Sequence, residues 1–263
     1  MHIESGRYTV RLANSDEDVA AAQRLRYSVF VEEMGAKPKP EDAELRQERD
    51  RFDPFCDHLL LTDNSTGGSV VGVYRLLRKS VAIAPGGPGF YTASEYDLSP
   101  METFNGETLE LGRSCVAADY RGTAAMQLLW IALSQYTVEF EIKLMFGAAS
   151  FHGVDIEPLK VPLSFLHHHH LAPEAIRPRT LPQHYVNMNL LPEEQIDRAE
   201  ALRMLPALMK GYMRLGGYVG DGAFIDREFN TVDVCLVMDT AKITQRYKDF
   251  YARRGGDIER ILG

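Results

Sequence analysis

The stretch between residues 109 and 138 constrains the fold most, because it has the pattern of a strand, a short turn and a helix. Leu109, Leu111 and Val116 lie in a run without proline that predicts a strand, and from Ala125 onwards apolar residues recur at steps of three and four, which predicts a helix over 125–138. The turn between them directs backbone N–H groups and the positive end of the helix toward one point. This arrangement suits an anionic phosphate.

The predicted strand also carries two charges, Glu110 and Arg113, which are three residues apart. In a regular strand two such side chains face opposite sides of the sheet. Gly112 lies between them, and a glycine inside a strand often marks a bulge, whose extra residue turns both side chains toward one cleft. The alternative is a surface ion pair on an edge strand. The adjoining turn favours a functional site.

Composition limits the class of protein. The 263 residues are 45% hydrophobic and 25% charged, which fits a single soluble globular domain. The formal net charge of −8 argues against general nucleic-acid binding through a basic face. The 3 cysteines are far apart without a CxxC motif, which favours reduced intracellular thiols over disulfides or a zinc site. No signal peptide is visible and the apolar runs are too short to span a bilayer, so we expect a cytoplasmic protein.

Further strands and helices are predicted around the central segment. Strands are predicted at 7–12, 57–62, 69–77, 143–150, 218–226 and 232–238, with a turn at 64–68. Helices are predicted from Ser15 to about Met34, over 162–171, from Pro192 to an interruption at Pro206, and over 207–215. Residues 36–49 are predicted as a loop or short helix, and residues 172–191 as a loop or lid. This order of elements predicts a mixed α/β sheet.

Polar residues outside the central segment are also candidates for a site. Arg26 and Phe30 share one helix face, although a surface arginine over a packed phenylalanine is the simpler interpretation. Asp50 and Asp53 flank an aromatic residue ahead of a strand and are either held against the protein body or solvated. Arg75 stands in an otherwise apolar strand, so it lies at a cleft or faces solvent.

A tract of four histidines, residues 167–170, falls on a predicted helix. Consecutive helical positions point in different directions, so the four side chains cannot converge on one ion. We therefore expect a polar surface with at most one histidine facing the site, and no metal site.

The chain order resembles the Gcn5-related N-acetyltransferase (GNAT) fold. That family binds the pyrophosphate of coenzyme A with a turn of the pattern Arg/Gln-x-x-Gly-x-Gly/Ala, which matches residues 121–126 here. Ala124 and Met126 stand where the pattern has glycine, and larger residues allow less close backbone approach. A single phosphodiester does not need the backbone to come as close as a pyrophosphate does. We therefore expect the donor to be a phosphopantetheine thioester on an acyl carrier protein. The residues expected to bind it are Val116, Arg121, Gly122, Thr123 and Ala124.

A second resemblance is to acyl-homoserine-lactone synthases, which use acyl carrier proteins on a related fold. It rests on Arg26-x-x-x-Phe30, Asp50-x-x-Asp53, Arg75 and Glu110-x-x-Arg113 in this order. The tryptophan that follows the first motif in that family is missing, since the 1 tryptophan here is Trp130.

Nearly the whole chain resembles the L-ornithine N-α-acyltransferase family of ornithine-lipid synthesis. The resemblance is carried by residues 25–33, 50–53, 74–77, 110–115, 146–151 and 220–226. It implies a single GNAT-like domain over residues 1–263, with a largely antiparallel central sheet flanked by helices and a helical insertion near 155–215. It also implies transfer of a 3-hydroxyacyl chain from acyl carrier protein to the α-amine of ornithine, giving lyso-ornithine lipid.

Three alternatives stay open: transfer to glutamine or another amino acid, a homoserine-lactone-type signal synthase, and a noncatalytic protein that binds acyl carrier protein or membranes. No separate cofactor is expected, because the acyl-phosphopantetheine is a co-substrate. Candidates for docking the acidic carrier protein are Arg121 and the basic C-terminal segment, which contains Lys242, Arg246, Lys248, Arg253 and Arg254. The alternative is that these charges form an ordinary solvated face. A peripheral encounter with the inner membrane is expected from the amphiphilic product.

Roles follow from the chemistry of amide formation. Glu110 is expected to be the general base, because only a neutral amine attacks a thioester; Arg113 is its expected catalytic neighbour. The alternative is a structural pair between the two. Arg26 or Arg75 would hold the substrate carboxylate, and the second amine would meet an acidic residue, Asp50 or Asp53. Backbone N–H groups near residues 114–116 would bind the oxyanion. The acyl chain would run between the sheet and the helix at 125–138, although apolar residues there equally well form ordinary core.

Overall fold

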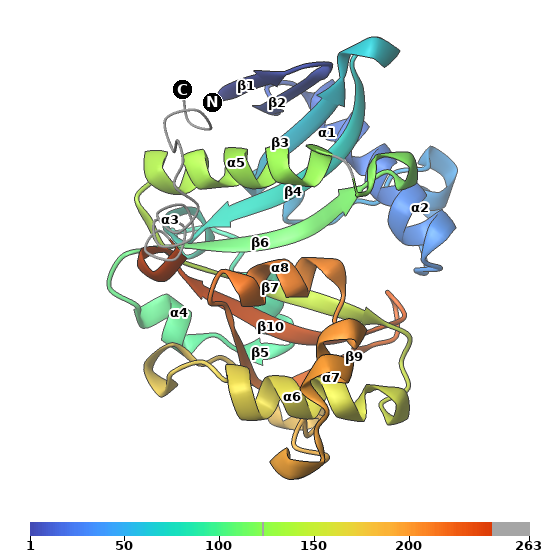
Figure 1. The fold of residues 1–263 in the computed structure, drawn as a ribbon. Helices are drawn as coiled ribbons and strands as arrows, with labels where there is room; N and C mark the ends of the chain where they lie inside the picture. The colour runs from blue at the N-terminus through green and yellow to red at the C-terminus, as the bar shows by residue number, and fades with distance from the viewer. Residues whose placement is uncertain (123, 244–263) are drawn as a thin grey trace, which may run out of the picture.

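A computed structural model of the chain describes residues 1–122 and 124–243 and shows one central sheet with helices on both faces (Figure 1). The described strands are β1 (His2–Ser5), β2 (Tyr8–Leu12), β3 (Asp57–Asp63), β4 (Ser69–Arg78), β5 (Tyr96–Asp97), β6 (Glu107–Val116), β7 (Ile142–His152), β8 (Arg179–Thr180), β9 (Tyr218–Asp226) and β10 (Thr231–Asp239). Their order in the sheet is β1-β2-β3-β4-β6-β7-β10-β9-β8-β5.

The sheet is mixed and largely antiparallel, as predicted. Among the described strands, β6 and β7 pair in parallel, as do β8 and β9, and the other neighbours are antiparallel. Strand β6 lies between β4 and β7, so the alternative that placed it at an edge is wrong. The short strands β1, β5 and β8 were not predicted, since each is four residues or fewer and carries no clear alternation.

The N-terminal helix starts where its capping signal predicts and then changes type. Ser15 accepts a hydrogen bond from the backbone N–H of Asp18, and α1 (Asp16–Arg26) follows. The next seven residues form a π-helical segment, η1 (Tyr27–Glu33), in place of the predicted continuous α-helix. Such segments are rare and concentrate at functional sites.

Two helices cover opposite faces of the N-terminal half of the sheet. Helix α5 (Ala124–Glu139) packs Leu129 and Ala132 against the face that carries Leu59 and Leu61. On the other face, α1 packs Ala22 and neighbouring residues against a separate apolar cluster. The small elements between these helices are α2 (Pro40–Leu45), η2 (Asp53–Phe55), η3 (Asn64–Thr66), α3 (Lys79–Ala82), η4 (Tyr91–Ser94), α4 (Ser99–Thr103) and η5 (Ala118–Tyr120).

The C-terminal half of the sheet carries the remaining helices. These elements are η6 (Glu157–Leu159), α6 (Lys160–His170), η7 (Glu174–Ile176), η8 (Pro182–His184), η9 (Glu193–Gln195), α7 (Arg198–Met204) and α8 (Ala207–Arg214). Figure 1 shows α8 lying across β7 and β10. The prediction of a helix opening at Pro192 is wrong, because only a single 3-10 turn forms there. Asp197 caps the actual helix by accepting from Ala199 N and Glu200 N.

Other sequence predictions hold in the described residues. All three cysteines are free thiols. No helix of this part of the chain is both long and apolar enough to cross a bilayer. The boundaries of the insertion near 155–215 stay a prediction. The basic residues beyond Ile243 and the turn residue Thr123 lie outside the described residues.

Candidate active site

Strand β6 contains the predicted bulge, one residue beyond Gly112. The register between β4 and β6 shifts between Val73 and Arg75, so that β6 has one extra residue at this point. Arg113 adopts a left-handed backbone conformation with φ of 50°, which is uncommon for a residue other than glycine. Both Arg113 and Glu110 line the same cavity, as the bulge predicts.

Glu110 is buried and bonds to the backbone of η4. Its Oε2 accepts from Tyr91 N at 2.9 Å, and its Oε1 accepts from Thr92 N at 2.8 Å. Burial raises the pKa of Glu110 above its usual value, and hydrogen bonds from Thr92 and Tyr91 limit the rise. Arg113 forms its ion pairs with other carboxylates, so the alternative of a Glu110–Arg113 pair is not observed.

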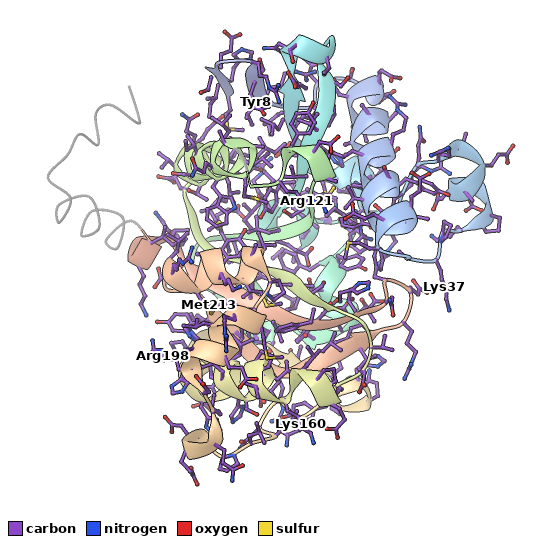
Figure 2. All side chains as sticks on the ribbon, turned by 45° about the vertical axis from the view of Figure 1, so that its right-hand side comes forward. Tyr8, Lys37, Arg121, Lys160, Arg198 and Met213 are labelled. Carbon is purple, nitrogen blue, oxygen red and sulfur yellow. The ribbon has the colours of Figure 1, made fainter. Side chains whose placement is uncertain are left out.

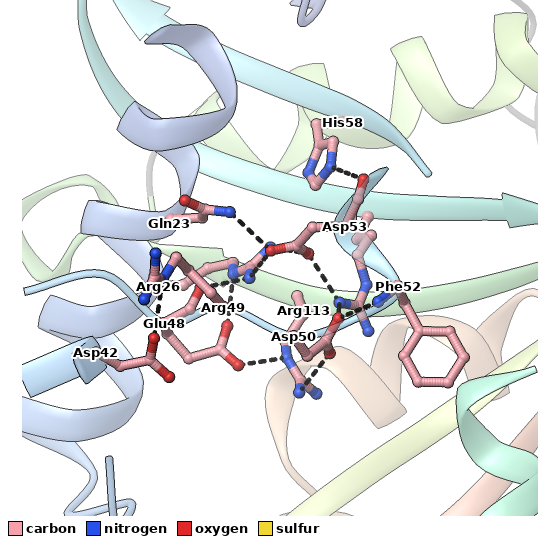
Figure 3. A network of polar contacts seen from close by, with 11 residues as sticks. Gln23, Arg26, Asp42, Glu48, Arg49, Asp50, Phe52, Asp53, His58 and Arg113 are labelled. Carbon is pink, nitrogen blue, oxygen red and sulfur yellow. Dashed lines mark hydrogen bonds and ion pairs between the residues drawn. The ribbon is translucent and has the colours of Figure 1, made fainter. Parts of the chain in front are cut away.

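Beside Glu110, three arginines and three carboxylates form a closed ring of ion pairs (Figure 3). Each arginine contacts two carboxylates and each carboxylate contacts two arginines, so the formal charges cancel. The nitrogen–oxygen distances are 2.6 Å for Arg26–Glu48, 2.8 Å for Arg26–Asp53, 2.6 Å for Arg75–Asp50, 2.9 Å for Arg75–Asp53, 3.0 Å for Arg113–Glu48 and 3.1 Å for Arg113–Asp50.

The ring is buried, so its ion pairs are little screened by solvent and shift the pKa values of its aspartates. The side chain of Arg26 is 1% exposed, and Asp53 also accepts a hydrogen bond from Gln23 at 2.8 Å. Burial alone would raise the pKa values of Asp50 and Asp53, but the adjacent arginines outweigh it and hold both below their usual range. The two aspartates are therefore ionised at neutral pH and already paired.

The structure brings the predicted substrate-binding residues together, although they differ in access to the cavity. Phe30 and Arg75 line it, whereas Arg26, Asp50 and Asp53 lie behind them in the ring. Their role in substrate binding stays a prediction. Sequence reasoning missed Glu48, which completes the ring. Its signal was weak because it lies in a segment rich in other charges.

The cavity has a volume of about 720 Å³ and passes between β6 and β7. These strands pair only as far as Glu110 opposite Phe146; beyond that point Gly112–Val116 and Gly147–Ser150 both line the cavity. Along a strand, alternate side chains point to opposite faces. Glu110 and Arg75 thus approach the cavity from one face of the sheet, while Tyr74 and Leu111 approach it from the face covered by α5.

One arm of the cavity is apolar. It is lined from the sheet by residues such as Met145, Leu236 and Met238. Helix α5 contributes Met126 and Gln127, in agreement with the predicted contribution of that helix. Helix α8 adds a lining that was not predicted: Ala207, Leu208 and Tyr212. The Tyr212 hydroxyl is 2.9 Å from that of Tyr74.

The predicted phosphate-binding turn lies at another end of the cavity. Val116, Arg121 and Gly122 line it, and α5 starts at Ala124. Arg121, labelled in Figure 2, donates from Nε to the Val116 carbonyl at 2.9 Å and pairs with Glu33 of η1 through Nη2 at 2.8 Å. The turn is thus held by the π-helical segment. Phosphopantetheine binding there stays a prediction.

The histidine tract lies away from the cavity. None of its residues is among the lining side chains of the described chain, so the expectation that one histidine faces the site is not supported. His168 Nε2 is 3.0 Å from the Leu191 carbonyl oxygen, and His169 is near Glu193. The tract therefore packs α6 against the segment that follows β8.

Comparisons with known proteins agree with this geometry. Residues 25–131 match the family model described as an acetyltransferase (GNAT) domain. The chain is 49% identical over 94% of its length to the L-ornithine N(alpha)-acyltransferase of Rhodobacter capsulatus, of which it covers 95%. The chain belongs to the L-ornithine N(alpha)-acyltransferase family. The family enzyme of Agrobacterium fabrum is 42% identical over 98% of this chain and 88% of its own.

A solved structure supports the fold of this family member. FeeM, described as an N-acyl amino acid synthase from uncultured soil microbes, superposes with a TM-score of 0.53 over 91% of this chain and 94% of its own. The two sequences are 11% identical, so the likeness concerns the fold alone. The family and the GNAT-type domain establish that the protein is an acyltransferase.

Proposed function

We propose that the protein transfers a 3-hydroxyacyl chain from acyl carrier protein to the α-amine of ornithine, giving lyso-ornithine lipid. The main support is the 49% identity over nearly the whole chain to an L-ornithine N(alpha)-acyltransferase. The cavity fits a reaction between two substrates of different polarity, because one arm is apolar and the other carries Arg75, Glu110 and Arg113.

In the proposed reaction Glu110 is the general base. Its side chain lines the charged arm of the cavity, and burial raises its pKa, which makes the carboxylate a stronger base. It takes a proton from the α-ammonium group, directly or through one water. The neutral amine then attacks the thioester carbonyl carbon. As the tetrahedral intermediate collapses, the C–S bond breaks, the departing pantetheine sulfur takes the remaining ammonium proton and leaves as the thiol, and the amide is formed; Glu110 then returns its proton to solvent.

The bulge in β6 supplies candidate oxyanion donors. The extra residue of a bulge is left out of the ladder of backbone hydrogen bonds. The N–H groups near residues 114–116 therefore point toward the cavity in this proposal, where the thioester oxygen becomes negative. Arg113 stacks over the rings of Tyr91 at 4.6 Å and Phe229 at 4.7 Å, which fixes its guanidinium beside the reaction centre.

The donor would approach from the side of Arg121 and the start of α5. There the phosphodiester of phosphopantetheine would meet the turn at 121–124, and the acyl chain would enter the arm lined by α8. An acidic carrier protein would contact Arg121, which is about half-exposed.

The test is an assay of the purified protein with 3-hydroxyacyl carrier protein and separate amino acids, read by mass spectrometry. We expect N-acyl-ornithine as the main product. If glutamine is acylated and ornithine is not, the acceptor is glutamine and the proposed acceptor is wrong. If a lactone forms from S-adenosylmethionine, the protein is a signal synthase and the proposed reaction is wrong. Equal turnover of acyl-coenzyme A and acyl carrier protein would contradict the proposal that acyl carrier protein is the specific donor.

A further inference from the structure

A second group of carboxylates lies at the charged arm of the cavity, apart from the ion-pair ring. Glu95 follows η4, Asp226 ends β9 and Asp233 lies in β10. One oxygen of each lies within 4.8 Å of the others. Asp226 and Asp233 line the cavity that also contains Glu110, whereas Glu95 is outside the lining and reaches the other two carboxylates from behind. Neither prediction from sequence nor the ring described above gives these three residues a role.

Two oxygens of this cluster are buried without a hydrogen-bond partner among the described residues. They are Oε2 of Glu95 and Oδ1 of Asp233, in side chains of residues that are 4% and 5% exposed. Buried polar atoms are nearly always paired, because leaving one unpaired costs free energy. An unpaired carboxylate oxygen beside a cavity therefore indicates a ligand that donates to it.

The cluster also has no cation of its own. None of its carboxylates forms an ion pair with a lysine, arginine or histidine in the described part of the chain, whereas every carboxylate of the ring forms two. Asp226 uses its Oδ1 to accept from the backbone N–H groups of Glu228 and Phe229, which shapes the β9–β10 hairpin. In contrast to the neutralised ring, this cluster leaves carboxyl oxygens of Glu95 and Asp233 free to accept hydrogen bonds from an incoming cation.

We propose that Glu95, Asp226 and Asp233 bind the side-chain ammonium group of the amino-acid acceptor, in place of Asp50 and Asp53, which already pair with two arginines each. This inference rests on the proposed acylation of ornithine and names the residues that select it. A primary ammonium group has three N–H donors, which matches three carboxylates around one point. A neutral side chain would leave the cluster unpaired, so the site favours a diamino acid over glutamine.

The protonation states agree with this placement. Burial, followed by repulsion from Asp233 and Asp226, raises the pKa of Glu95 to about 9. Burial raises the pKa of Asp233 to about 6; the nearby hydroxyls of Ser150 and Thr231 oppose the rise, although neither makes a hydrogen bond to Oδ1. Arg113 lowers the pKa of both, and Glu110 raises that of Glu95. An arriving ammonium group favours the ionised carboxylates, so its binding releases a proton near pH 7.

The experiment compares ornithine with norvaline, which is the same amino acid without the distal amine. We expect wild-type kcat/KM for ornithine to exceed that for norvaline by at least about a hundredfold, because a site built for a charged donor rejects the analogue that lacks it. In D233N and in E95Q this ratio should fall to within about tenfold, mainly through a higher KM for ornithine. Two variants are used so that a folding defect in one leaves the other informative.

The matched control is D221N, which neutralises a β9 carboxylate that pairs with Arg179 outside the cavity. It should keep the wild-type ratio. A wild-type enzyme that acylates ornithine and norvaline equally would overturn this inference while leaving the proposed function intact. A wild-type enzyme that acylates no amino acid would overturn both.

Calorimetry gives a readout that does not depend on turnover. Titration of ornithine in buffers of different ionisation enthalpy should show proton release at pH 7.5 for the wild type and less for E95Q. Activity that disappears with EDTA and returns with Mg²⁺ would assign the cluster to a metal ion and contradict the ammonium site.

Discussion

At Glu110, burial and backbone hydrogen bonding act on the carboxylate in opposite directions. Burial favours the protonated acid, whereas the N–H groups of Tyr91 and Thr92 favour the carboxylate. The net result is a raised pKa, which makes the carboxylate a better proton acceptor, as the proposed general base requires. The two N–H groups also fix the orientation of the carboxylate toward the cavity.

The variant E110Q tests this role. We expect kcat to fall by about 10²- to 10⁴-fold, because glutamine keeps the shape but cannot accept the proton. The wild-type rate should rise with pH through the pKa of Glu110, since only the carboxylate is active, and this rise should be missing in E110Q. Thermal unfolding serves as the control for folding, and near-wild-type kcat would refute the assignment.

The ring of ion pairs makes a different prediction for Asp53. In D53N two buried arginines, Arg26 and Arg75, each lose a partner, so the free energy of unfolding should fall by about 3 to 5 kcal/mol. Urea unfolding measures this. The control E17Q breaks the exposed pair of Glu17 with Arg24 and should change stability by less than about 1 kcal/mol. Equal effects of both changes would contradict the importance of the buried ring.

At the scale of elements, the contact between α5 and α8 shapes the apolar arm of the cavity. Gly211 of α8 lies against the indole ring of Trp130 of α5, and a Cβ at that position would overlap the ring. The next residue, Tyr212, stacks at 5.7 Å on the same indole. The close approach of the two helices therefore depends on the glycine.

The variant G211A should push α8 away from α5 and disturb the arm that we assign to the acyl chain. We expect a higher KM for long-chain donors with a smaller effect on short ones, measured with a series of acyl carrier proteins. In the double variant G211A/W130F the smaller ring makes room, so part of the loss should be recovered. Equal effects on all chain lengths would place the acyl chain elsewhere.

At the scale of the whole molecule, two groups of carboxylates have opposite pKa shifts and therefore opposite effects on how the stability of the fold changes with pH. Asp50 and Asp53 have lowered pKa values, so they stabilise the fold above their usual range and less as the pH falls. Glu95 and Asp233 have raised values, so their burial is tolerated at low pH and becomes costly as the pH rises toward those values.

The variant E95Q should therefore be stabilised relative to the wild type more at pH 8 than at pH 5. Between the usual pKa of glutamate and a folded value of about 9, the cost of keeping this group neutral grows by about 1.4 kcal/mol per pH unit. Melting temperatures of the ligand-free proteins at the two pH values measure the difference. If the difference in melting temperature between E95Q and the wild type is the same at both pH values, the pKa of Glu95 is not raised in the folded protein.

The sequence predicted local features of this molecule better than long-range ones. The strand, bulge and helix around Glu110 follow from glycine placement and periodicity within one short segment, and they were predicted. The ring partner Glu48 and the acidic cluster were missed, because their members come from elements far apart in sequence and meet only through the sheet. Helix α7 begins later than Pro192 predicts, because Asp197 and not the proline provides its N-terminal cap.

The passage of the cavity between β6 and β7 has a consequence for the order of events in catalysis. In the proposed reaction the acyl donor and the amino acid would reach the reaction centre from opposite faces of the sheet, so neither would have to leave before the other arrives. Both substrates would then be bound together, and the reaction would need no acyl-enzyme. Initial rates measured against both concentrations should therefore give intersecting lines in a double-reciprocal plot, whereas parallel lines would indicate a ping-pong reaction.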